Sequence, residues 1–480
     1  MAKPAVLLIG GLDPQGCAGI AADIATVQHH DCHPLPLITA MTEQSSAGLT
    51  ALGAVNTNKL MAQYRNCKAD FDIQAIKVGL IPDLIIAEKV KQILLDNPDI
   101  PVVMDPVLAS SSGGKTVADG VRQYIRDELL QHLTLLTPNL PELSLLTDNL
   151  EDVEQATTIL SEEGLQACLV KGGHADSEFA TDFFISEQVR FYCYQTKYAS
   201  DVRGTGCVLA SAIASHLASG QDMRDAVVLA KTYVSRGIRQ AQTVGSYRLI
   251  KHSHEPLALE DIPRLCYQKT LIGQQFNFPS CPSRLGIYPV VDSTEWVQKL
   301  VDIGIETIQL RVKDRDEKTT SQQIKQAVEY LGHKPVNFFV NDHWQIAIEQ
   351  GAYGVHLGQE DLHDANLKQI VDAGLRLGIS THSYWELARA LAVNPSYIAL
   401  GPIFETTSKQ MPFSPQGVER LKQWVTMLDG NYPIVAIGGI NYERARLLKP
   451  TGVGSVAMIT AITLADDYQK TTRDLLALWQ

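Results

Sequence analysis

The sequence lacks the features that mark several classes of protein. Its eight cysteines form no CxxC pair and have no closely spaced histidine partners, which argues against a zinc site or a disulfide framework. No apolar run is as long as a transmembrane helix, and the start, Met1-Ala2-Lys3-Pro4, does not have the form of a signal peptide. No basic run offsets the formal net charge of -12, so neither nucleic acid nor a membrane is expected as a partner. We predict a cytoplasmic protein that acts on small molecules.

Cysteine and tryptophan divide the chain into two parts. All eight cysteines lie at or before Cys281, and all five tryptophans lie at or after Trp296. Between these parts, prolines and histidines break any hydrophobic periodicity. A chain of 480 residues, 45% apolar and 20% charged, has room for two folded units. We predict a first domain over residues 1–250, a linker over 251–283 and a second domain over 284–480.

Short apolar runs in the first domain alternate with helical patterns. This alternation predicts a mostly parallel α/β sheet, whose ligands bind at the carboxyl ends of the strands. The runs are residues 5–9, 35–40, 75–78, 102–104, 133–136 and 167–170. Polar residues follow five of these runs: Gly11 and Asp13, Gln44, Asp105, Asn139 and Glu142, and Lys171.

The run Arg203-Gly204-Thr205-Gly206-Cys207 comes directly before an Ala-rich helical segment, residues 208–217. A glycine turn at a helix start presents several backbone N–H groups to one point, with the positive end of the helix dipole behind them. It therefore predicts an anion-binding site at Gly204 and Gly206. A thiolate is stabilised in such a position, so we expect Cys207 to act as a base or nucleophile near neutral pH. Taken alone, the motif is better explained by an ordinary helix start with a buried cysteine than by an anion-binding site. The polar residues at the ends of the predicted strands change this balance in favour of the site.

The first domain resembles the hydroxymethylpyrimidine/phosphomethylpyrimidine kinase family, which has the ribokinase-like fold. The resemblance spans residues 1 to about 245 and includes Asp105-Pro106-Val107, Thr137-Pro138-Asn139, Val170-Lys171-Gly172-Gly173-His174 and Gly204-Thr205-Gly206-Cys207. It implies that Cys207 is the catalytic base and that Mg²⁺ assists the transfer. It also implies that the pyrimidine contacts Gly11, Asp23, Gln44 and Val107. We expect ATP and its phosphates at Asp105, Asn139, Glu142, Lys171, Gly204 and Gly206.

The first domain also departs from that family's pattern. Leu12 stands where a serine is usual, Cys17 interrupts a glycine-rich run, and Arg203 replaces a histidine. Glu43 and the pair Ser110-Ser111 are further departures. These changes bear on nucleotide affinity and rate more than on identity. They leave a weakened or non-catalytic kinase half as the alternative.

Eight short β-like runs recur at near-regular spacing in the second domain, with helical segments between them. This pattern predicts a compact (β/α)₈ TIM barrel, whose chemistry lies at the carboxyl ends of the strands. His356 lies inside the fourth run, so we expect a hydrogen-bonded core histidine rather than a ligand or base. The runs are residues 285–291, 307–312, 336–340, 354–357, 377–380, 397–400, 434–437 and 455–459.

Charged residues follow neighbouring strands of the predicted barrel. Gln309, Arg311 and Lys313 alternate along one run, so we expect them on one face, where a cationic surface suits a diphosphate. Asp342 and Asp361 follow the next two runs, and two carboxylates beside a diphosphate are what Mg²⁺ prefers. A cap or a surface salt bridge is the simpler role for either carboxylate alone. The two together, opposite a cationic strand, favour a metal site.

The second domain resembles thiamine-phosphate synthase over residues 285 to 480. The motifs include Gln309-Leu310-Arg311, Val340-Asn341-Asp342, Gly354-Val355-His356-Leu357-Gly358-Gln359 and Gly438-Gly439-Ile440. The resemblance implies Mg²⁺ on Asp342 and Asp361. It implies the pyrimidine diphosphate on Gln309, Arg311, Lys313, Asn341, Ser380 and Lys409. It implies the thiazole phosphate near Thr406, Thr407, Ser408, Gly439, Ile459 and Thr460.

The two resemblances fit one reaction sequence. The first domain would use ATP and Mg²⁺ to phosphorylate hydroxymethylpyrimidine twice. The second would join the diphosphate to a thiazole phosphate, giving thiamine phosphate and pyrophosphate. Two alternatives stay open: a barrel that binds these compounds without turnover, which would not need paired aspartates, and a first domain that only stabilises the barrel. The sequence leaves open the oligomeric state, homo-oligomers included, the domain orientation and the preferred nucleotide.

Overall fold

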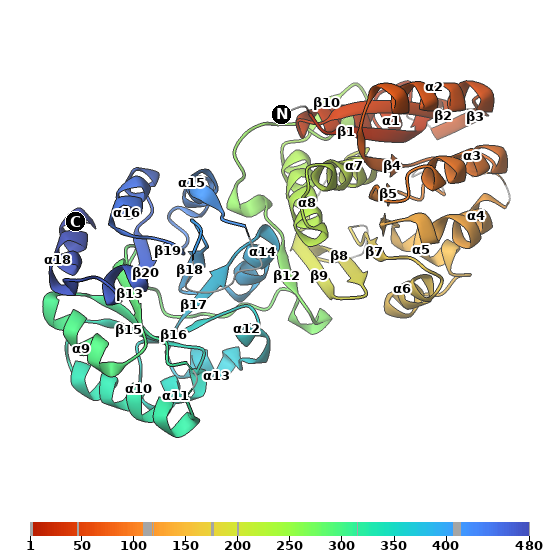
Figure 1. Ribbon diagram of the computed structural model, residues 1–480. Helices are drawn as coiled ribbons and strands as arrows, with labels where there is room; N and C mark the ends of the chain where they lie inside the picture. Colours follow the sequence, from red (N-terminus) through yellow and green to blue (C-terminus); the bar gives the residue numbers. More distant parts are fainter. Residues whose placement is uncertain are drawn as a thin grey trace. The chain divides into compact units, whose positions relative to one another are not determined.

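The computed structural model describes residues 3–45, 48–108, 118, 120–173, 177–198, 201–313, 315–406 and 414–479. The chain forms two compact units (Figure 1). The first comprises Met1–Glu255 with Glu260–Gly273, and the second comprises Pro256–Leu259 with Gln274–Gln480.

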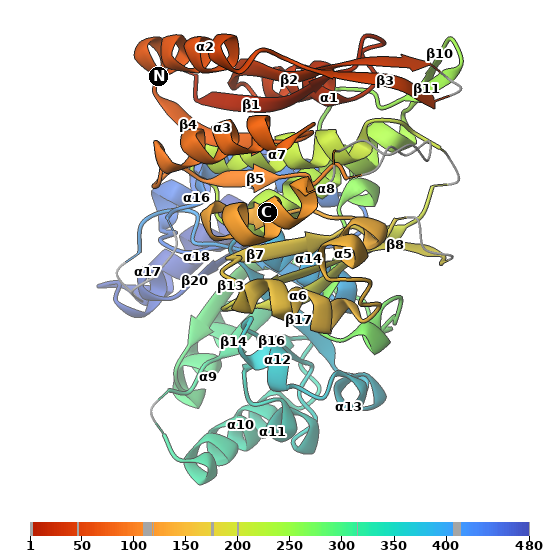
Figure 2. The same ribbon diagram turned by 90° about the vertical axis from the view of Figure 1, so that its right-hand side faces the viewer.

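The first unit is built on one sheet, in which ten strands of the described residues pair in the order β12-β9-β8-β7-β6-β5-β4-β1-β2-β3. The six strands from β7 to β2 in this order are parallel, as predicted, and antiparallel strands extend both edges. In Figure 2, β1, β4, β5 and β7 lie one below another. The strands are β1 Ala5–Leu12, β2 His33–Ser45, β3 Gly48–Ala54, β4 Ile73–Val78, β5 Val102–Met104, β6 Leu135–Leu136, β7 Ala167–Val170, β8 Phe179–Ser186, β9 Arg190–Thr196 and β12 Arg264–Cys266.

Helices cover the sheet, so its central strands are apolar on both faces. Seven of the eight residues of β1 are buried, and α7 is buried along Val208–Ser215. Continuous apolar strands of this kind are typical of parallel sheets. The helices are α1 Gly19–His29, α2 Thr57–Asp70, α3 Leu84–Leu95, α4 Val121–Tyr124, α5 Leu140–Leu146, α6 Val153–Glu162, α7 Thr205–Ala218 and α8 Met223–Arg239; a hairpin of β10 Gln242–Val244 and β11 Tyr247–Leu249 follows.

Part of the predicted linker is a structural part of the first unit. β12 pairs with β9 at the sheet edge, with Leu265 opposite Cys193. Asp261, which is fully buried, accepts two hydrogen bonds from Arg239, at 2.9 Å from Nε and 2.8 Å from Nη2. Residues 260–273 therefore belong to the first unit. The proline-broken sequence hides this because the strand has three residues and depends on a distant partner.

The second unit is a closed barrel, in which eight strands of the described chain pair in parallel in sequence order. The predicted (β/α)₈ fold is confirmed. The strands are β13 Gly286–Val291, β14 Thr307–Leu310, β15 Asn337–Asn341, β16 Gly354–Leu357, β17 Arg376–Thr381, β18 Tyr397–Leu400, β19 Ile434–Ile437 and β20 Ser455–Met458. The helices are α9 Thr294–Ile303, α10 Glu317–Leu331, α11 Trp344–Glu349, α12 Asp361–Asp364, α13 Leu367–Asp372, α14 Tyr384–Val393, α15 Gly417–Leu428, α16 Tyr442–Leu448, α17 Thr460–Thr463 and α18 Tyr468–Trp479.

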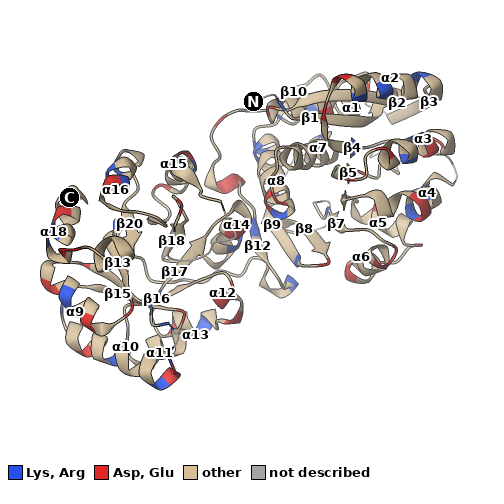
Figure 3. Cartoon of the chain, viewed as in Figure 1, with Lys and Arg blue, Asp and Glu red and all other residues tan. Residues whose placement is uncertain are grey.

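All eight cysteines are free thiols, so the predicted absence of a disulfide framework is confirmed. Within the described ranges, none of the helices combines the length and apolar character needed to span a bilayer. Acidic and basic residues are interspersed along the helices of each unit (Figure 3).

Candidate active sites of the two units

The glycine turn of the first unit opens α7 as predicted. Gly204 has φ of +80°, and a Cβ there would lie 2.3 Å from the carbonyl oxygen of Cys17, so only glycine fits. A Cβ at Gly206 would lie 3.3 Å from Lys171 Nζ and 3.4 Å from Asp105 Oδ2. The structure therefore brings the turn, the end of β5 and the end of β7 to one place. Backbone N–H groups at a helix start and a lysine beside them can hold a phosphate.

Lys171 and two carboxylate partners form one side of this site. Lys171 Nζ lies 2.6 Å from Asp105 Oδ1 and 3.9 Å from Glu142 Oε2. Asn139 and Glu142 form a capping box at the start of α5, with both hydrogen bonds at 2.8 Å. Burial raises the pKa of Glu142 to about 7, although Lys171 lowers it. A cation bound nearby would favour the ionised form of this carboxyl, and a phosphate would favour the protonated form.

Cys207 lies on the first turn of α7 beside the start of α1. The backbone N–H of Gly19 hydrogen-bonds to its thiol. Burial raises the pKa of this thiol to about 12, and the Lys77 ammonium, which lowers it, does not offset burial. The expectation of a thiolate near neutral pH is therefore wrong for the ligand-free protein. Desolvation outweighs the helix dipole, an effect that the sequence pattern does not show.

A buried ion pair lies close to Cys207. Lys77 Nζ donates to Asp23 Oδ2 at 2.7 Å, and Ser211 Oγ donates to Asp23 Oδ1 at 2.7 Å. Lys77 and Asp23 are both almost inaccessible to solvent. Burial alone would lower the pKa of Lys77, but Asp23 and Cys207 raise it, so the lysine stays charged. Both oxygens of Asp23, the residue expected to contact the pyrimidine, therefore already accept a hydrogen bond within the protein.

The other residues expected to contact the pyrimidine lie at strand ends. Gly11 is near the end of β1, and the carbonyl oxygen of Gly11 lies close to Gly19 at the start of α1. Gln44 lies in β2 beyond its pairing with β1, opposite Leu49 of β3. Val107 follows β5, and its N–H donates to the Asp105 carbonyl oxygen at 2.9 Å. All three are on the edge of the sheet that the sequence predicted.

Two aspartates face each other at the mouth of the barrel. Burial raises the pKa of Asp342 to about 6, and the neighbouring Asp361 carboxylate raises it further while Arg311 lowers it. Asn341 Nδ2 donates to the Asp342 carboxylate. Asp342 has φ of +64°, a left-handed conformation in which Asp and Asn are tolerated better than most residues. Hard oxygen ligands under mutual repulsion fit Mg²⁺, and the described residues add no third His, Cys, Asp or Glu to form a metal-binding group there.

A chain of hydrogen bonds crosses the barrel interior and links two of the predicted substrate contacts. Its bonds are Gln309 Nε2 to Tyr288 OH at 3.1 Å, Tyr288 OH to Tyr397 OH at 2.9 Å, Tyr397 OH to His356 Nδ1 at 2.7 Å and His356 Nε2 to Ser380 Oγ at 2.8 Å. Burial lowers the pKa of His356 to about 3, so the ring is neutral. The prediction of a hydrogen-bonded core histidine is confirmed. The network fixes Gln309 and Ser380 before any ligand arrives.

The cationic strand is shorter than predicted. β14 ends at Leu310, although Arg311 N still donates to the Val291 carbonyl oxygen at 2.7 Å. Strand alternation therefore places Gln309 and Arg311 on one face but does not extend to Lys313, which is exposed. The end of pairing with β13 explains the difference.

The predicted thiazole phosphate residues lie at the last strand ends. A Cβ at Gly439, whose φ is +64°, would lie 2.4 Å from the Glu405 carbonyl oxygen, so the loops after β18 and β19 touch. Phe404 N donates to the Gly438 carbonyl oxygen at 3.2 Å. Thr406 ends the described part of the first loop, and Ile459 and Thr460 begin α17. Thr407, Ser408 and Lys409 lie outside the described residues.

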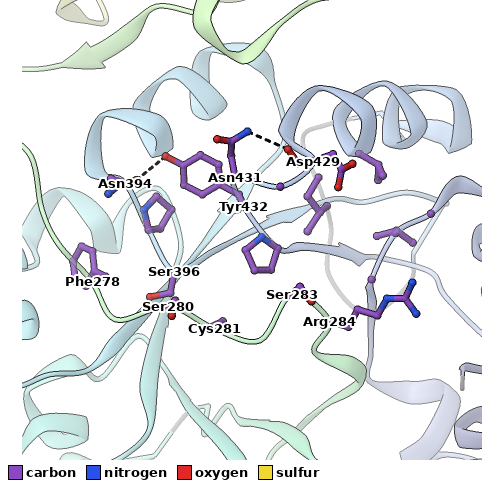
Figure 4. Close-up of a pocket in the computed structure, with 18 residues that line it drawn as sticks. Phe278, Ser280, Cys281, Ser283, Arg284, Asn394, Ser396, Asp429, Asn431 and Tyr432 are labelled. Carbon is purple, nitrogen blue, oxygen red and sulfur yellow. Dashed lines mark hydrogen bonds between the residues drawn. The ribbon is translucent and has the colours of Figure 1, made fainter.

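A cavity of about 570 Å³ lies at the other end of the barrel, where strands β18, β19 and β20 begin. Figure 4 shows two of its hydrogen bonds, from Tyr432 OH to Asn394 Oδ1 at 2.7 Å and from Asn431 Nδ2 to the Asp429 carbonyl oxygen at 3.1 Å. Ser396 Oγ donates to the Pro279 carbonyl oxygen at 2.7 Å. The bond from Ser396 to Pro279 holds the segment that precedes β13 against the barrel floor, at the end opposite the aspartates.

Comparison with known proteins agrees with this division of the chain. The family model for phosphomethylpyrimidine kinase matches residues 13–252, and that for thiamine monophosphate synthase matches residues 287–462. Thiamine-phosphate synthase of Citrobacter koseri is 50% identical over 204 residues, 42% of this chain and 96% of that protein. The enzyme of Yersinia pseudotuberculosis is 54% identical over 202 residues, 42% of this chain and 94% of that protein. The chain belongs to both families.

It is a bifunctional transferase of thiamine biosynthesis, with a phosphomethylpyrimidine kinase unit followed by a thiamine-phosphate synthase unit. A solved structure, the pyridoxal kinase from Staphylococcus aureus, is 23% identical, covers 55% of this chain and 98% of its own, and has a TM-score of 0.50. That likeness shows the ribokinase-like fold of the kinase unit alone.

Sequence reasoning missed the polar residues that support both sites. Lys77 lies inside an apolar strand pattern, and Ser211 lies one helical turn after Cys207, where a small polar residue signals little. Tyr288 and Tyr397 likewise lie in buried strands. The one available signal was a lysine within a buried run, which requires a partner.

Proposed function

We propose that the kinase unit transfers the γ-phosphoryl group of ATP first to the hydroxyl of hydroxymethylpyrimidine and then to the resulting monophosphate. The synthase unit then joins the diphosphate to thiazole phosphate and releases pyrophosphate. One observation supports the proposal: a single chain contains both a glycine-rich helix start beside Cys207 and a carboxylate pair near Arg311. The product of the first site is the substrate of the second.

In the kinase unit, the turn residues Gly204 and Gly206 and the side chain of Lys171 hold the transferred phosphoryl group. Positioning and charge neutralisation supply most of the catalysis in such transfers. Cys207 takes the proton of the acceptor hydroxyl, and its raised pKa means that the thiol must ionise as the substrate binds. Since Gly206, Lys171 and Asp105 meet beside Cys207, we favour an active kinase over a non-catalytic half.

In the synthase unit, Asp342 and Asp361 would hold Mg²⁺, which when bound neutralises charge on the departing diphosphate. Arg311 and Asn341 line the same mouth, and Gln309 and Ser380, fixed by the interior network, orient the pyrimidine. We assign the diphosphate to these residues with Lys313 and Lys409, and the thiazole phosphate to Thr406, Thr407, Ser408, Gly439, Ile459 and Thr460. No protein nucleophile is required, because the ring's amino group supplies electrons as the diphosphate leaves.

Further parts of the proposal concern the cell and the assembly. ATP as co-substrate and eight free thiols fit the cytoplasm. Each unit has its own sheet and core, so we expect each to act on its small-molecule substrates without the other. We leave a homo-oligomer as an open part of the proposal.

The test is reconstitution with the full-length protein. Incubation with hydroxymethylpyrimidine, ATP, Mg²⁺ and thiazole phosphate should yield thiamine phosphate, measured by chromatography. Cys207→Ala should stop this synthesis unless pyrimidine diphosphate is supplied, and Asp361→Asn should stop it even then. If Cys207→Ala retained full synthesis from hydroxymethylpyrimidine, the catalytic role proposed for Cys207 would be wrong.

A further inference from the structure

Three cationic side chains surround the glycine turn of the kinase unit, and two of them are committed to carboxylates. Lys77 is paired with Asp23 at 2.7 Å, and Lys171 with Asp105 at 2.6 Å. Arg203 makes no ion pair with any residue that the structure describes. An uncommitted guanidinium next to an anion-binding turn is available for a ligand.

The Arg203 guanidinium is nevertheless held in place. Its central carbon lies 4.8 Å from the centroid of the Tyr247 ring, in the hairpin that follows α8. Tyr247 OH donates to Gln15 Oε1 at 2.5 Å, and Arg203 N donates to the Arg248 carbonyl oxygen at 3.0 Å. Stacking on an aromatic face leaves the edge of a guanidinium, with its N–H groups, free to bind.

Arg203 also borders the loop that follows β1. Gly204 packs against the Cys17 carbonyl oxygen, and the Arg203 charge lowers the pKa of the Cys17 thiol, although burial and Asp13 raise it more. The Asp13 carboxylate accepts one hydrogen bond on each oxygen, from Gln15 N at 3.0 Å and from Cys17 N at 3.1 Å. Arg203 thus lies between the phosphate turn and the loop on the pyrimidine side.

The two phosphoryl transfers make different demands on this site. In both, the bond between the β,γ-bridging oxygen and the γ-phosphorus of ATP breaks, a bond from the γ-phosphorus to the acceptor oxygen forms, and ADP leaves. In the first transfer the acceptor is a hydroxyl, which must lose its proton to a base. In the second the acceptor is a phosphate, whose second pKa is about 6, so its oxygen is already ionised near neutral pH. The second transfer therefore needs less help from a base and more from a cation, because it brings two anions together.

We propose that Arg203 binds the phosphate of the monophosphate acceptor and is the residue that supports the second phosphorylation. The inference rests on the proposed kinase function and assigns a different residue to each of its two phosphoryl transfers. Cys207 serves the first transfer, and Arg203 serves the second. Tyr247 is a positioning residue that holds Arg203 by stacking.

The experiment compares the two steps in the full-length protein. Hydroxymethylpyrimidine and its monophosphate are supplied separately with ATP and Mg²⁺, and the monophosphate, the diphosphate and ADP are quantified. Arg203→Gln should lower kcat/KM for the monophosphate by about 10- to 100-fold, the range expected for a lost charge-assisted hydrogen bond. The first step should change by less than about threefold, so that monophosphate accumulates from hydroxymethylpyrimidine. Cys207→Ala should show the reverse preference.

Matched variants separate this role from a structural one. Arg248→Gln removes an exposed arginine of the same hairpin and should leave both steps unchanged. If Arg203→Gln does not fold, Arg203→Lys, which keeps the charge, decides: near-normal second-step activity supports the proposal, and an equal loss of both steps overturns it. An equal effect of Arg203→Gln on both steps, or none on either, also overturns it. If the unmodified protein phosphorylated neither acceptor, the proposed kinase function itself would fail.

Discussion

Asp342→Asn should make the ligand-free synthase unit more stable while abolishing its activity. Burial raises the pKa of Asp342 from 3.8 to about 6, and repulsion by the neighbouring Asp361 carboxylate contributes to the rise. A difference of that size corresponds to about 3 kcal/mol. Because Asp342 is partly exposed, solvent screening reduces the expected gain to about 2 kcal/mol. Asparagine tolerates the left-handed backbone and can still accept from Asn341, so the substitution adds little strain.

The sign of this effect depends on pH. A carboxyl with a raised pKa in the folded state holds its proton more tightly there than in the unfolded chain. The cost of ionising it is absent below about pH 4, grows between pH 4 and 6, and is complete above about pH 6. The gain from Asp342→Asn should follow the same course. Mg²⁺ should stabilise the unmodified protein and have little effect on the variant.

The measurement is scanning calorimetry of the full-length protein in EDTA at pH 7.5 and pH 4.5, with the synthase transition assigned by a fragment of residues 274–480. For a unit of this size, about 2 kcal/mol corresponds to roughly 5 °C in the melting temperature. Asp361→Asn should give a smaller gain, because it removes the repulsion but leaves the Asp342 carboxylate buried, and the double variant should gain little beyond Asp342→Asn alone. A variant no more stable than the parent at pH 7.5, or equally stabilised at pH 4.5, would refute the like-charge reasoning.

Three further predictions test the kinase unit. Cys207→Ala should lower kcat for hydroxymethylpyrimidine by about 10²- to 10⁴-fold, with little change in pyrimidine affinity measured by calorimetry. In the unmodified protein, kcat/KM for hydroxymethylpyrimidine should keep rising up to pH 9, because the pKa of the Cys207 thiol is about 12. A plateau of this rate constant near pH 7 would contradict the prediction. Lys77→Met should destabilise the unit by about 3–5 kcal/mol in urea, because the buried Asp23 loses its cationic partner. Adding Asp23→Leu should recover most of that loss, and no recovery would mean that Lys77 acts by packing alone. A fragment of residues 1–273 should fold and phosphorylate hydroxymethylpyrimidine. A fragment of residues 1–250, which lacks β12 and Asp261, should melt at a lower temperature or aggregate. Equal melting curves would show that the sheet edge formed by β12 is dispensable.

The sequence predicted the barrel more closely than the kinase sheet, for a physical reason. Strands β16, β18 and β19 have the predicted bounds, because each short apolar run of a parallel barrel is set off by its flanking loops. The antiparallel strands β8 and β9 were not predicted. Their place depends on pairing with β7 and with each other, which a local pattern does not encode.

In the two sites as well, features set by neighbouring residues could be predicted from the sequence, and features set by distant residues could not. The turn at Gly204 is a local signal, and it opens α7 as predicted. Asn139 and Glu142, which were expected as phosphate ligands, form a capping box at the start of α5. The protonation state of Cys207 was not predictable, because it depends on burial and on Lys77, which is 130 residues earlier in the sequence. The sequence also did not show that strand alternation stops before Lys313, because this depends on where β14 stops pairing with β13.

In each site one charged group is not fully compensated by the described residues around it, and the sign of that group indicates the ligand. In the kinase unit, Arg203 has no carboxylate partner among the described residues, so the site favours an anion. In the synthase unit, Asp342 and Asp361 are held against each other, so the site favours a cation. An enzyme that must bind phosphates tightly gains from keeping such groups in place before the ligand arrives, because no reorganisation then opposes binding. The same arrangement lowers the stability of the ligand-free protein, and for that reason the Asp342→Asn variant should lose activity and gain stability in one step.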